Sequence, residues 1–187
     1  SFEYGILSQY PEITELQDSS VIRTGDYVRV NVGYNKDTYF YLIYKDSNEE
    51  FNLIYSKDME STEFTESSIY TTALYWSQFT DPKGYETFYF INTLEEKQEL
   101  LKLLRQYDRV NKNGRVKISK KIQSELDKLN PNNTQGLDMA VSRYEKSIIG
   151  GVTFRSGEDN KLNDMSITHL CTGKYGVAFK EVVLNHK

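Results

Sequence analysis

His169 and Cys171 are the two residues of this chain whose types and spacing suit nucleophilic chemistry. A thiol becomes a nucleophile when a neighbouring base takes its proton, and residues at i and i+2 of a strand project from the same side. Catalytic pairs, however, usually combine base and nucleophile from separate elements, with a third side chain that orients the base. No such Asn or Asp accompanies this pair, and a lone cysteine is more often a buried structural residue. We therefore predict no catalytic residue and a protein that is not an enzyme.

Acidic side chains offer a second kind of chemistry, the binding of a metal ion. Asp46, Asn48 and Glu50 have the alternate spacing that opens a calcium loop. Phe51 stands where that loop needs glycine and no Glu closes it, so this segment is predicted to be a turn. The other acidic clusters are predicted to be solvated loops; they contain Asp58, Glu60, Glu63, Glu66, Glu158, Asp159 and Asp164.

The two histidines and one cysteine of the chain are too few for a four-ligand zinc site. His186 lies next to the last residue and is expected to titrate in solvent. No metal and no other cofactor is therefore expected.

Charge is unevenly divided along the chain, whose net charge is −4. Residues 1–93 carry a net charge of −9 and residues 94–187 a net charge of +5. Solvated helix surfaces are the favoured explanation of the basic cluster, and anion binding is the alternative. A nucleic-acid partner is not expected, because phosphate binding requires a more concentrated basic face. The cluster consists of Lys97, Lys102, Arg105, Arg109, Lys112, Arg115, Lys117, Lys120 and Lys121.

Aromatic residues are abundant, with 15 Tyr, 9 Phe and one Trp in 187 residues. Exposed Tyr and Trp side chains can stack on sugar rings or anchor a protein partner. The alternative is that they fill a core, with only their hydroxyl groups reaching its edge. The candidate binding surface consists of Tyr39, Tyr41, Tyr44, Tyr75, Trp76 and Tyr89.

The segments that must position these side chains are short aromatic and β-branched runs separated by Asn, Asp, Lys and Gly, a pattern typical of antiparallel strands. Alternation places Val28, Val30 and Val32 on one side of the first strand. The run 38–44 is apolar on both faces, so it is expected to lie centrally in a sheet. The expected strands are Val21–Tyr34, Thr38–Tyr44, Phe51–Tyr55, Ile69–Phe79 and Tyr85–Ile91.

A helical period replaces the strand pattern after residue 92. Helices are predicted over residues 94–107, with Thr93 and Glu96 as a capping box, and over residues 119–129, with Ser119 as N-cap. Two further strands are expected at 147–154 and 175–184.

The order of strands, helices and strands indicates an α+β fold, mainly an antiparallel β-sandwich-like sheet with two helices. We predict a single domain over residues 1–187. It comprises a polar lead-in (1–20), an aromatic strand block (21–92), a helical insert (93–130) and C-terminal strands (131–187). No apolar run is long enough for a transmembrane helix.

Several segments of the strand block resemble a bacterial family that is catalogued as a domain of unknown function (serial 4384). They are Gly-Asp-Tyr-Val-Arg-Val-Asn-Val at 25–32, Lys-Asp-Thr-Tyr-Phe-Tyr-Leu-Ile-Tyr at 36–44 and Phe-Asn-Leu-Ile-Tyr at 51–55. A Pro-x-Gly-x-Glu element before a further strand also matches, here at Pro82, Gly84 and Glu86. The resemblance covers roughly residues 21–107. The chain departs from the pattern at Thr38, where the family often has Gly.

The resemblance implies an accessory module rather than an enzyme. Such domains are attached to caspase-like peptidase or kinase domains, or belong to exported and lipid-anchored bacterial proteins. This implies an extracytoplasmic location, whether periplasmic, surface-anchored or secreted. We therefore expect a non-catalytic interaction domain of an exported bacterial protein that binds another protein. The alternative is a carbohydrate- or small-ligand-binding module that uses exposed Tyr and Trp.

Overall fold

The computed structural model describes residues 1–9, 12–56, 69–130, 141–142, 169–173 and 176–187. The order of its strands and helices confirms the predicted α+β class. The elements are β1 (Phe2–Gln9), β2 (Ile13–Leu16), β3 (Val21–Ile22), β4 (Tyr27–Asn35), β5 (Tyr39–Lys45), β6 (Phe51–Ser56), β7 (Ile69–Ala73), β8 (Ser77–Gln78), β9 (Gly84–Thr93), α1 (Gln98–Arg109), α2 (Lys112–Leu129), β10 (Val141–Ser142), β11 (His169–Cys171) and β12 (Val177–His186).

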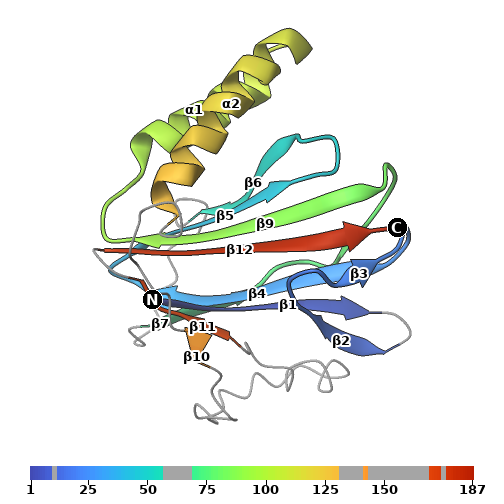
Figure 1. The fold of residues 1–187 in the computed structure, drawn as a ribbon. Coiled ribbons are helices and arrows are strands. Elements are labelled where there is room, and N and C mark those ends of the chain that lie inside the picture. Colours follow the sequence, from blue (N-terminus) through green and yellow to red (C-terminus); the bar gives the residue numbers. More distant parts are fainter. Residues whose placement is uncertain (10–11, 57–68, 131–140, 143–168, 174–175) are drawn as a thin grey trace.

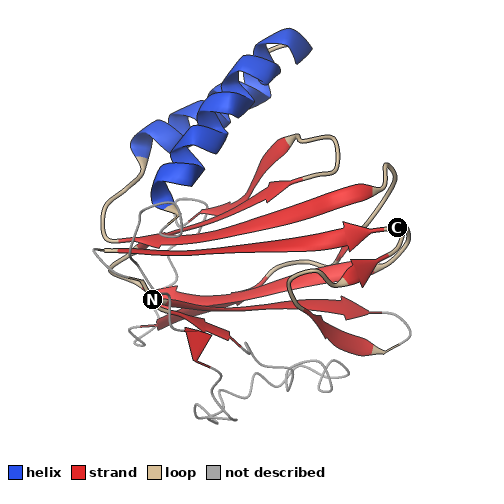
Figure 2. Ribbon diagram, in the orientation of Figure 1, coloured by secondary structure: helices blue, strands red, loops and turns tan. Residues whose placement is uncertain are grey.

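The strands form two sheets that face each other (Figure 1). A seven-stranded sheet has the order β10–β11–β1–β4–β7, with β2 paired to β1 and β8 paired to β4. A five-stranded sheet has the order β3–β12–β9–β5–β6, in which the short β3 runs parallel to β12. Figure 2 shows α1 and α2 as a helical hairpin on the outer side of the five-stranded sheet. The molecule therefore has three layers, with the five-stranded sheet in the middle.

The middle sheet is buried on both faces, and its strands supply two separate cores. In β9, Phe88 and Phe90 point into the core between the sheets, whereas Tyr89 and Ile91 point into the core beneath the helices. In β5, alternate residues divide in the same way. Strands covered on both faces read as continuous apolar runs rather than as alternating ones. The prediction that the run 38–44 lies within a sheet is thereby confirmed.

The expectation of a polar lead-in over residues 1–20 is wrong. Residues Phe2–Gln9 form β1, which lies between β4 on one side and β11 and β2 on the other. Phe2 and Ile6 are fully buried in the core between the sheets. The segment reads as polar because Glu3, Ser8 and Gln9 interrupt its alternation, and only pairing with β4 shows that it is a central strand.

Two of the predicted strands are each divided in two. A turn closed by the Asp26 N–H and the Arg23 carbonyl (3.0 Å) separates β3 from β4, and Gly25 within it has φ +96°. The two pieces join different sheets. The predicted strand 69–79 becomes β7 and β8, which both pair with β4. The valine alternation in β4 is confirmed, since Val28, Val30 and Val32 all lie in the core.

The predicted capping box of the first helix is wrong. Thr93 ends β9, and its hydroxyl donates to the Glu95 carbonyl at 2.7 Å. The helix begins only at Gln98, and the Lys97 N–H before it donates to the Tyr41 hydroxyl at 3.0 Å. A sheet tyrosine thus replaces the local side-chain cap that the sequence suggested.

The second helix begins seven residues before the predicted start. Asn111 is its N-cap, and its side-chain oxygen accepts a hydrogen bond from the Gly114 N–H at 3.0 Å. Ser119 lies inside the helix, where its hydroxyl donates to the Val116 carbonyl at 3.1 Å. The helical spacing of apolar residues indicates only the C-terminal half of α2, where Ile122 and Leu126 are buried.

The predicted turn at 46–50 is confirmed. The Asp46 side chain accepts hydrogen bonds from the N–H groups of Asn48 (2.9 Å) and Glu50 (2.8 Å), so it stabilises the turn. The predicted strand 175–184 corresponds to β12. The predicted strand 147–154 and the predicted loops 57–68 and 156–164 lie outside the described residues.

The start of α2 yields a test of the fold. The substitution Asn111→Ala removes the N-cap and should lower the free energy of unfolding by about 1 kcal/mol. Ser119→Ala is the matched control, because alanine is the better helix former at an interior position. Urea unfolding followed by circular dichroism measures both. An equal loss of stability in the two variants would contradict the helix start at Lys112.

Candidate functional site

A connected set of polar side chains lies between the two sheets, and we call it the Glu86–His186 network. The Tyr44 hydroxyl donates to Glu86 Oε2 at 2.5 Å, and Glu86 Oε1 lies 3.1 Å from His186 Nδ1. On its other side, His186 Nε2 lies 3.0 Å from Thr24 Oγ1. The Thr24 hydroxyl also lies 2.8 Å from Asp81 Oδ1. Five side chains from separate segments are thus joined into one chain of hydrogen bonds.

Strand register explains how these residues meet. β12, β9 and β5 are neighbours in the five-stranded sheet, and Glu86, His186 and Tyr44 lie on its inner side beside residues of the inter-sheet core. Thr24 comes from the turn between β3 and β4, and Asp81 from the turn before β9. Both turns lie at the end of the sandwich where β12 finishes (Figure 1).

The expectation that His186 titrates in solvent is wrong, because only 2 % of the residue is exposed. β12 continues to His186, and the Lys187 N–H after it donates to the Ile22 carbonyl of β3 at 3.0 Å. The Phe79 ring packs against the imidazole, with 5.8 Å between the ring centroids. Pairing on both sides of β12 therefore buries a residue that proximity to the end of the chain had suggested was exposed.

The network has the order of groups found in a hydrolase triad, namely a hydroxyl, an imidazole and a carboxylate. Two features oppose nucleophilic chemistry at Thr24. Its exposed hydroxyl has an alternative acceptor in Asp81. The N–H groups of the next two residues, Gly25 and Asp26, already donate to the carbonyls of Phe79 (2.8 Å) and Arg23 (3.0 Å). They are therefore not available as oxyanion donors, and we interpret the network as structural.

Burial and the hydrogen bond to Glu86 raise the pKa of the Tyr44 hydroxyl well above its usual value. Tyr44 therefore stays protonated and keeps donating to Glu86 over the whole physiological pH range. A carboxylate at this depth requires hydrogen-bond donors on both of its oxygens. Tyr44 and His186 occupy these two positions.

His169 and Cys171 are close in sequence, but the structure directs them to different partners. The Cys171 thiol lies in the core and donates to the Phe179 carbonyl at 3.6 Å, and burial raises its pKa to about 11. His169 Nε2 lies 2.5 Å from Glu15 Oε1, and its ring packs on Tyr4. A protonated, buried thiol is a poor nucleophile.

The six aromatic candidates do not share one surface. Tyr41 and Tyr89 are 2 % and 3 % exposed, and with the half-buried Tyr39 they belong to the core beneath the helices. Tyr44 belongs to the Glu86–His186 network. Tyr75, which is 96 % exposed, and the half-buried Trp76 lie between β7 and β8 in the other sheet. Only this last pair remains available for recognition.

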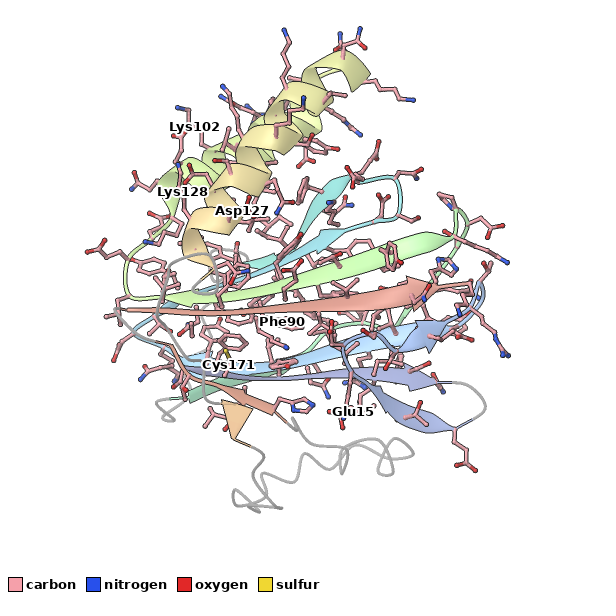
Figure 3. The ribbon with its side chains drawn as sticks, in the orientation of Figure 1. Glu15, Phe90, Lys102, Asp127, Lys128 and Cys171 are labelled. Carbon is pink, nitrogen blue, oxygen red and sulfur yellow. The ribbon has the colours of Figure 1, made fainter. Side chains whose placement is uncertain are left out.

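The helical hairpin contributes a strongly charged surface, which we call the basic hairpin and define as residues 98–129. It contains nine basic and four acidic residues. Its apolar side contacts the five-stranded sheet, whereas Lys102 and Lys128 point away from the sheet in Figure 3. Six of its cations form no ion pair with any described residue: Arg105, Arg109, Lys112, Lys117, Lys120 and Lys121.

The chain was compared with family models, with curated proteins and with solved structures, and none of them matches it. Neither helix combines the length and the apolar character needed to cross a membrane. The described residues also contain no cluster of three His, Cys, Asp or Glu side chains able to hold a metal ion.

The structural role of the Glu86–His186 network predicts a large loss of stability when it is broken. Glu86→Leu removes the partner of the Tyr44 hydroxyl and of His186 Nδ1, and the free energy of unfolding should fall by about 3–5 kcal/mol. Denaturant unfolding at pH 7 measures this effect.

Glu181→Gln is the matched control in the same sheet, because burial raises the pKa of Glu181. A raised carboxyl pKa means that the folded state binds the proton more tightly, so stability falls as Glu181 ionises with rising pH. Its neutralisation should therefore leave stability at pH 7 unchanged or slightly raised. If Glu86→Leu were as harmless as this control, the network would not be structural.

Cys171 should be unreactive in the native protein. With a pKa of about 11, its thiol is almost entirely protonated at pH 8, and the core shields it. Labelling with a thiol reagent should be at least about tenfold slower for the native protein than for the protein in denaturant. Fast native labelling that depends on the presence of His169 would contradict this assignment.

Proposed function

We propose that this protein is a non-catalytic interaction domain that binds an acidic protein surface through the basic hairpin. One observation carries the proposal: the hairpin presents cations in positions that weaken its own helices. Lys117 and Lys121 lie four residues apart on α2, where like charges destabilise a helix by about 0.2–0.5 kcal/mol. Lys112 begins the same helix, and no acidic residue lies in its first turn. A cation at that end opposes the helix dipole.

The pattern of the cations also supports binding rather than simple solvation. Lys102, Arg105 and Arg109 follow one another at helical spacing on the side of α1 opposite its buried leucines. On α2, Lys117, Lys121 and Lys128 also follow one another at helical spacing, on the side opposite the buried residues of that helix. Val116, which is 56 % exposed, adds an apolar contact beside them. Two adjacent basic stripes with an exposed apolar side chain suit a protein surface that is acidic and partly apolar.

The rest of the molecule favours a protein over a nucleic acid as partner. Outside the basic hairpin the chain carries a net charge of −9. Such a body repels a stiff polyanion such as duplex DNA, whereas a flexible acidic segment or a folded partner with an acidic patch can contact the hairpin alone. We extend the proposal to an accessory role in an exported bacterial protein, as the resemblance of residues 21–107 implies.

The alternative, a carbohydrate-binding module with a tyrosine platform, has less support. Such a platform needs several aromatic rings on one exposed face, and the sheet tyrosines lie beneath the helices instead. Tyr75 and Trp76 remain, and they belong to a different part of the molecule.

The proposal predicts that reversing three charges of the hairpin abolishes binding. The test variant carries Lys117→Glu, Lys120→Glu and Lys121→Glu, and the control carries Arg23→Glu, Lys83→Glu and Lys187→Glu on the sandwich. Both changes alter the net charge equally. With polyglutamate as probe, the wild type and the control should bind with an affinity that falls as salt rises. The test variant should lose at least about tenfold in affinity.

Capture from a nuclease-treated extract of the source cells extends the test to native partners. The proposal requires an acidic protein that the wild type and the control retain and the test variant loses. Lys117→Glu alone should raise the free energy of unfolding by about 0.5 kcal/mol, since it places opposite charges four residues apart. Equal binding by all variants would overturn the proposal, and so would tighter binding of DNA or anionic vesicles than of polyglutamate.

A further inference from the structure

The hydrogen bonds around Thr24 determine where the protons of the Glu86–His186 network lie. The Thr24 hydroxyl has one proton to donate. Its oxygen lies 2.8 Å from Asp81 Oδ1 and 3.0 Å from His186 Nε2. An ionised carboxylate only accepts hydrogen bonds, so the hydroxyl donates to Asp81 and presents its lone pairs to His186. His186 Nε2 must therefore carry a proton.

A second proton lies on the other side of the imidazole. His186 Nδ1 and Glu86 Oε1 are 3.1 Å apart, and only 2 % of each residue is exposed. Two bare acceptors this close and this deeply buried would repel each other, so a proton lies between them. The Tyr44 hydroxyl does not supply it, because that hydroxyl donates to the other carboxylate oxygen, Oε2. The pair thus holds one proton more than a neutral histidine beside a carboxylate, whichever of the two atoms carries it.

Loss of this proton to solvent leaves the imidazole with one proton and two neighbours. Among the described residues, Glu86 Oε1 has only His186 Nδ1 as a hydrogen-bonding partner, so the remaining proton is needed there. His186 Nε2 then becomes an acceptor, and the Thr24 hydroxyl must turn to it and leave Asp81. Asp81 is exposed and can bond to water instead, so the exchange satisfies the buried atom.

We propose that the proton shared by Glu86 and His186 controls a side-chain link between two turns of the sandwich. With the proton bound, Thr24 in the turn before β4 is bonded to Asp81 in the turn before β9. With the proton released, Thr24 is bonded to His186 and the link between the turns is lost. This pH-sensitive device is separate from the basic hairpin and goes beyond protein binding.

The change is confined to the outer part of the turn before β9. The base of this turn is held in either state by two backbone hydrogen bonds, from the Gly25 N–H to the Phe79 carbonyl (2.8 Å) and from the Phe79 N–H to the Asp26 carbonyl (2.9 Å). The Ser47 hydroxyl also donates to the Pro82 carbonyl at 2.6 Å. Release of the proton therefore alters one contact and leaves the fold intact.

The other ionisable groups around His186 do not take part in this exchange. Burial and the bond to Glu86 raise the pKa of Tyr44 far above its usual value, so its hydroxyl keeps its proton. The nearby aspartates accept hydrogen bonds from backbone N–H groups, and the nearby basic side chains are exposed. These aspartates are Asp18, Asp26 and Asp46, and the basic residues are Arg23, Lys83 and Lys187.

A double-mutant cycle measures the link between the turns. Thr24→Val and Asp81→Ala, separately and combined, are unfolded in urea at pH 5.5 and at pH 9, on either side of the range in which histidine ordinarily changes its charge. At pH 5.5 we expect a coupling of about threefold in the unfolding equilibrium constant, as one hydrogen bond contributes. At pH 9 the coupling should vanish. In a His186→Gln background it should not change with pH, because glutamine does not titrate.

Nitrogen NMR of the imidazole tests the same inference without relying on stability. The variant His169→Gln leaves His186 as the only histidine of the chain, so its two ring nitrogens can be assigned. At pH 9 we expect the proton at Nδ1 and none at Nε2. This measurement decides the question even if His186→Gln fails to fold.

The inference is overturned by a neutral ring that carries its proton at Nε2, or by a coupling that is absent at pH 5.5 or equal at the two pH values. A pH-dependent coupling that persists in folded His186→Gln would overturn it as well, because another group would then be responsible. Binding of polyglutamate through the basic hairpin is a separate measurement, so the two proposals can fail independently.

Discussion

Every residue of β9 from Glu86 to Thr93 is buried, because the five-stranded sheet has the seven-stranded sheet on one side and the helices on the other. The remainder of the structure follows from this double burial. Alternate side chains of β9, β5 and β12 must fill two cores of different shape, and large aromatic rings supply that volume. The tyrosines that face the helices thus form part of the surface on which α1 and α2 pack. The Tyr41 hydroxyl also accepts a hydrogen bond from the Lys97 N–H just before α1.

Double burial also explains the Glu86–His186 network. A carboxylate and an imidazole enclosed by a sheet on each side have no water to satisfy them, so they must satisfy each other. Tyr44, Glu86 and His186 come from three neighbouring strands of the same sheet, and Thr24 and Asp81 extend the network to two turns at its edge. The order of these groups resembles a hydrolase triad, and we interpret it as a consequence of the hydrogen-bonding needs of the core. Its partners hold the C-terminal end of β12 in place.

Because most of the described aromatic residues are committed to packing, the proposed recognition depends on charge. The basic hairpin keeps six of its nine cations outside ion pairs with the described residues, at some cost to its own helices. This hairpin forms an outer layer of the molecule, on the side of the five-stranded sheet that faces away from the seven-stranded sheet (Figure 1).

By itself, the sequence determined the α+β class, the alternation in β4, the strand pair β5–β6, the turn at Asp46 and the existence of both helices, because each depends on local periodicity or turn chemistry. Only the tertiary structure decided that Phe2–Gln9 is a central strand, that α1 begins after Lys97, that His186 is buried and that Tyr41 and Tyr89 are covered. These outcomes depend on which strand lies alongside and which layer lies above, and neither is encoded within a window of neighbouring residues. Whether a tyrosine or histidine is buried depends on its neighbours in space. The local sequence pattern could therefore identify candidate binding residues, but it could not separate the buried ones from the exposed ones.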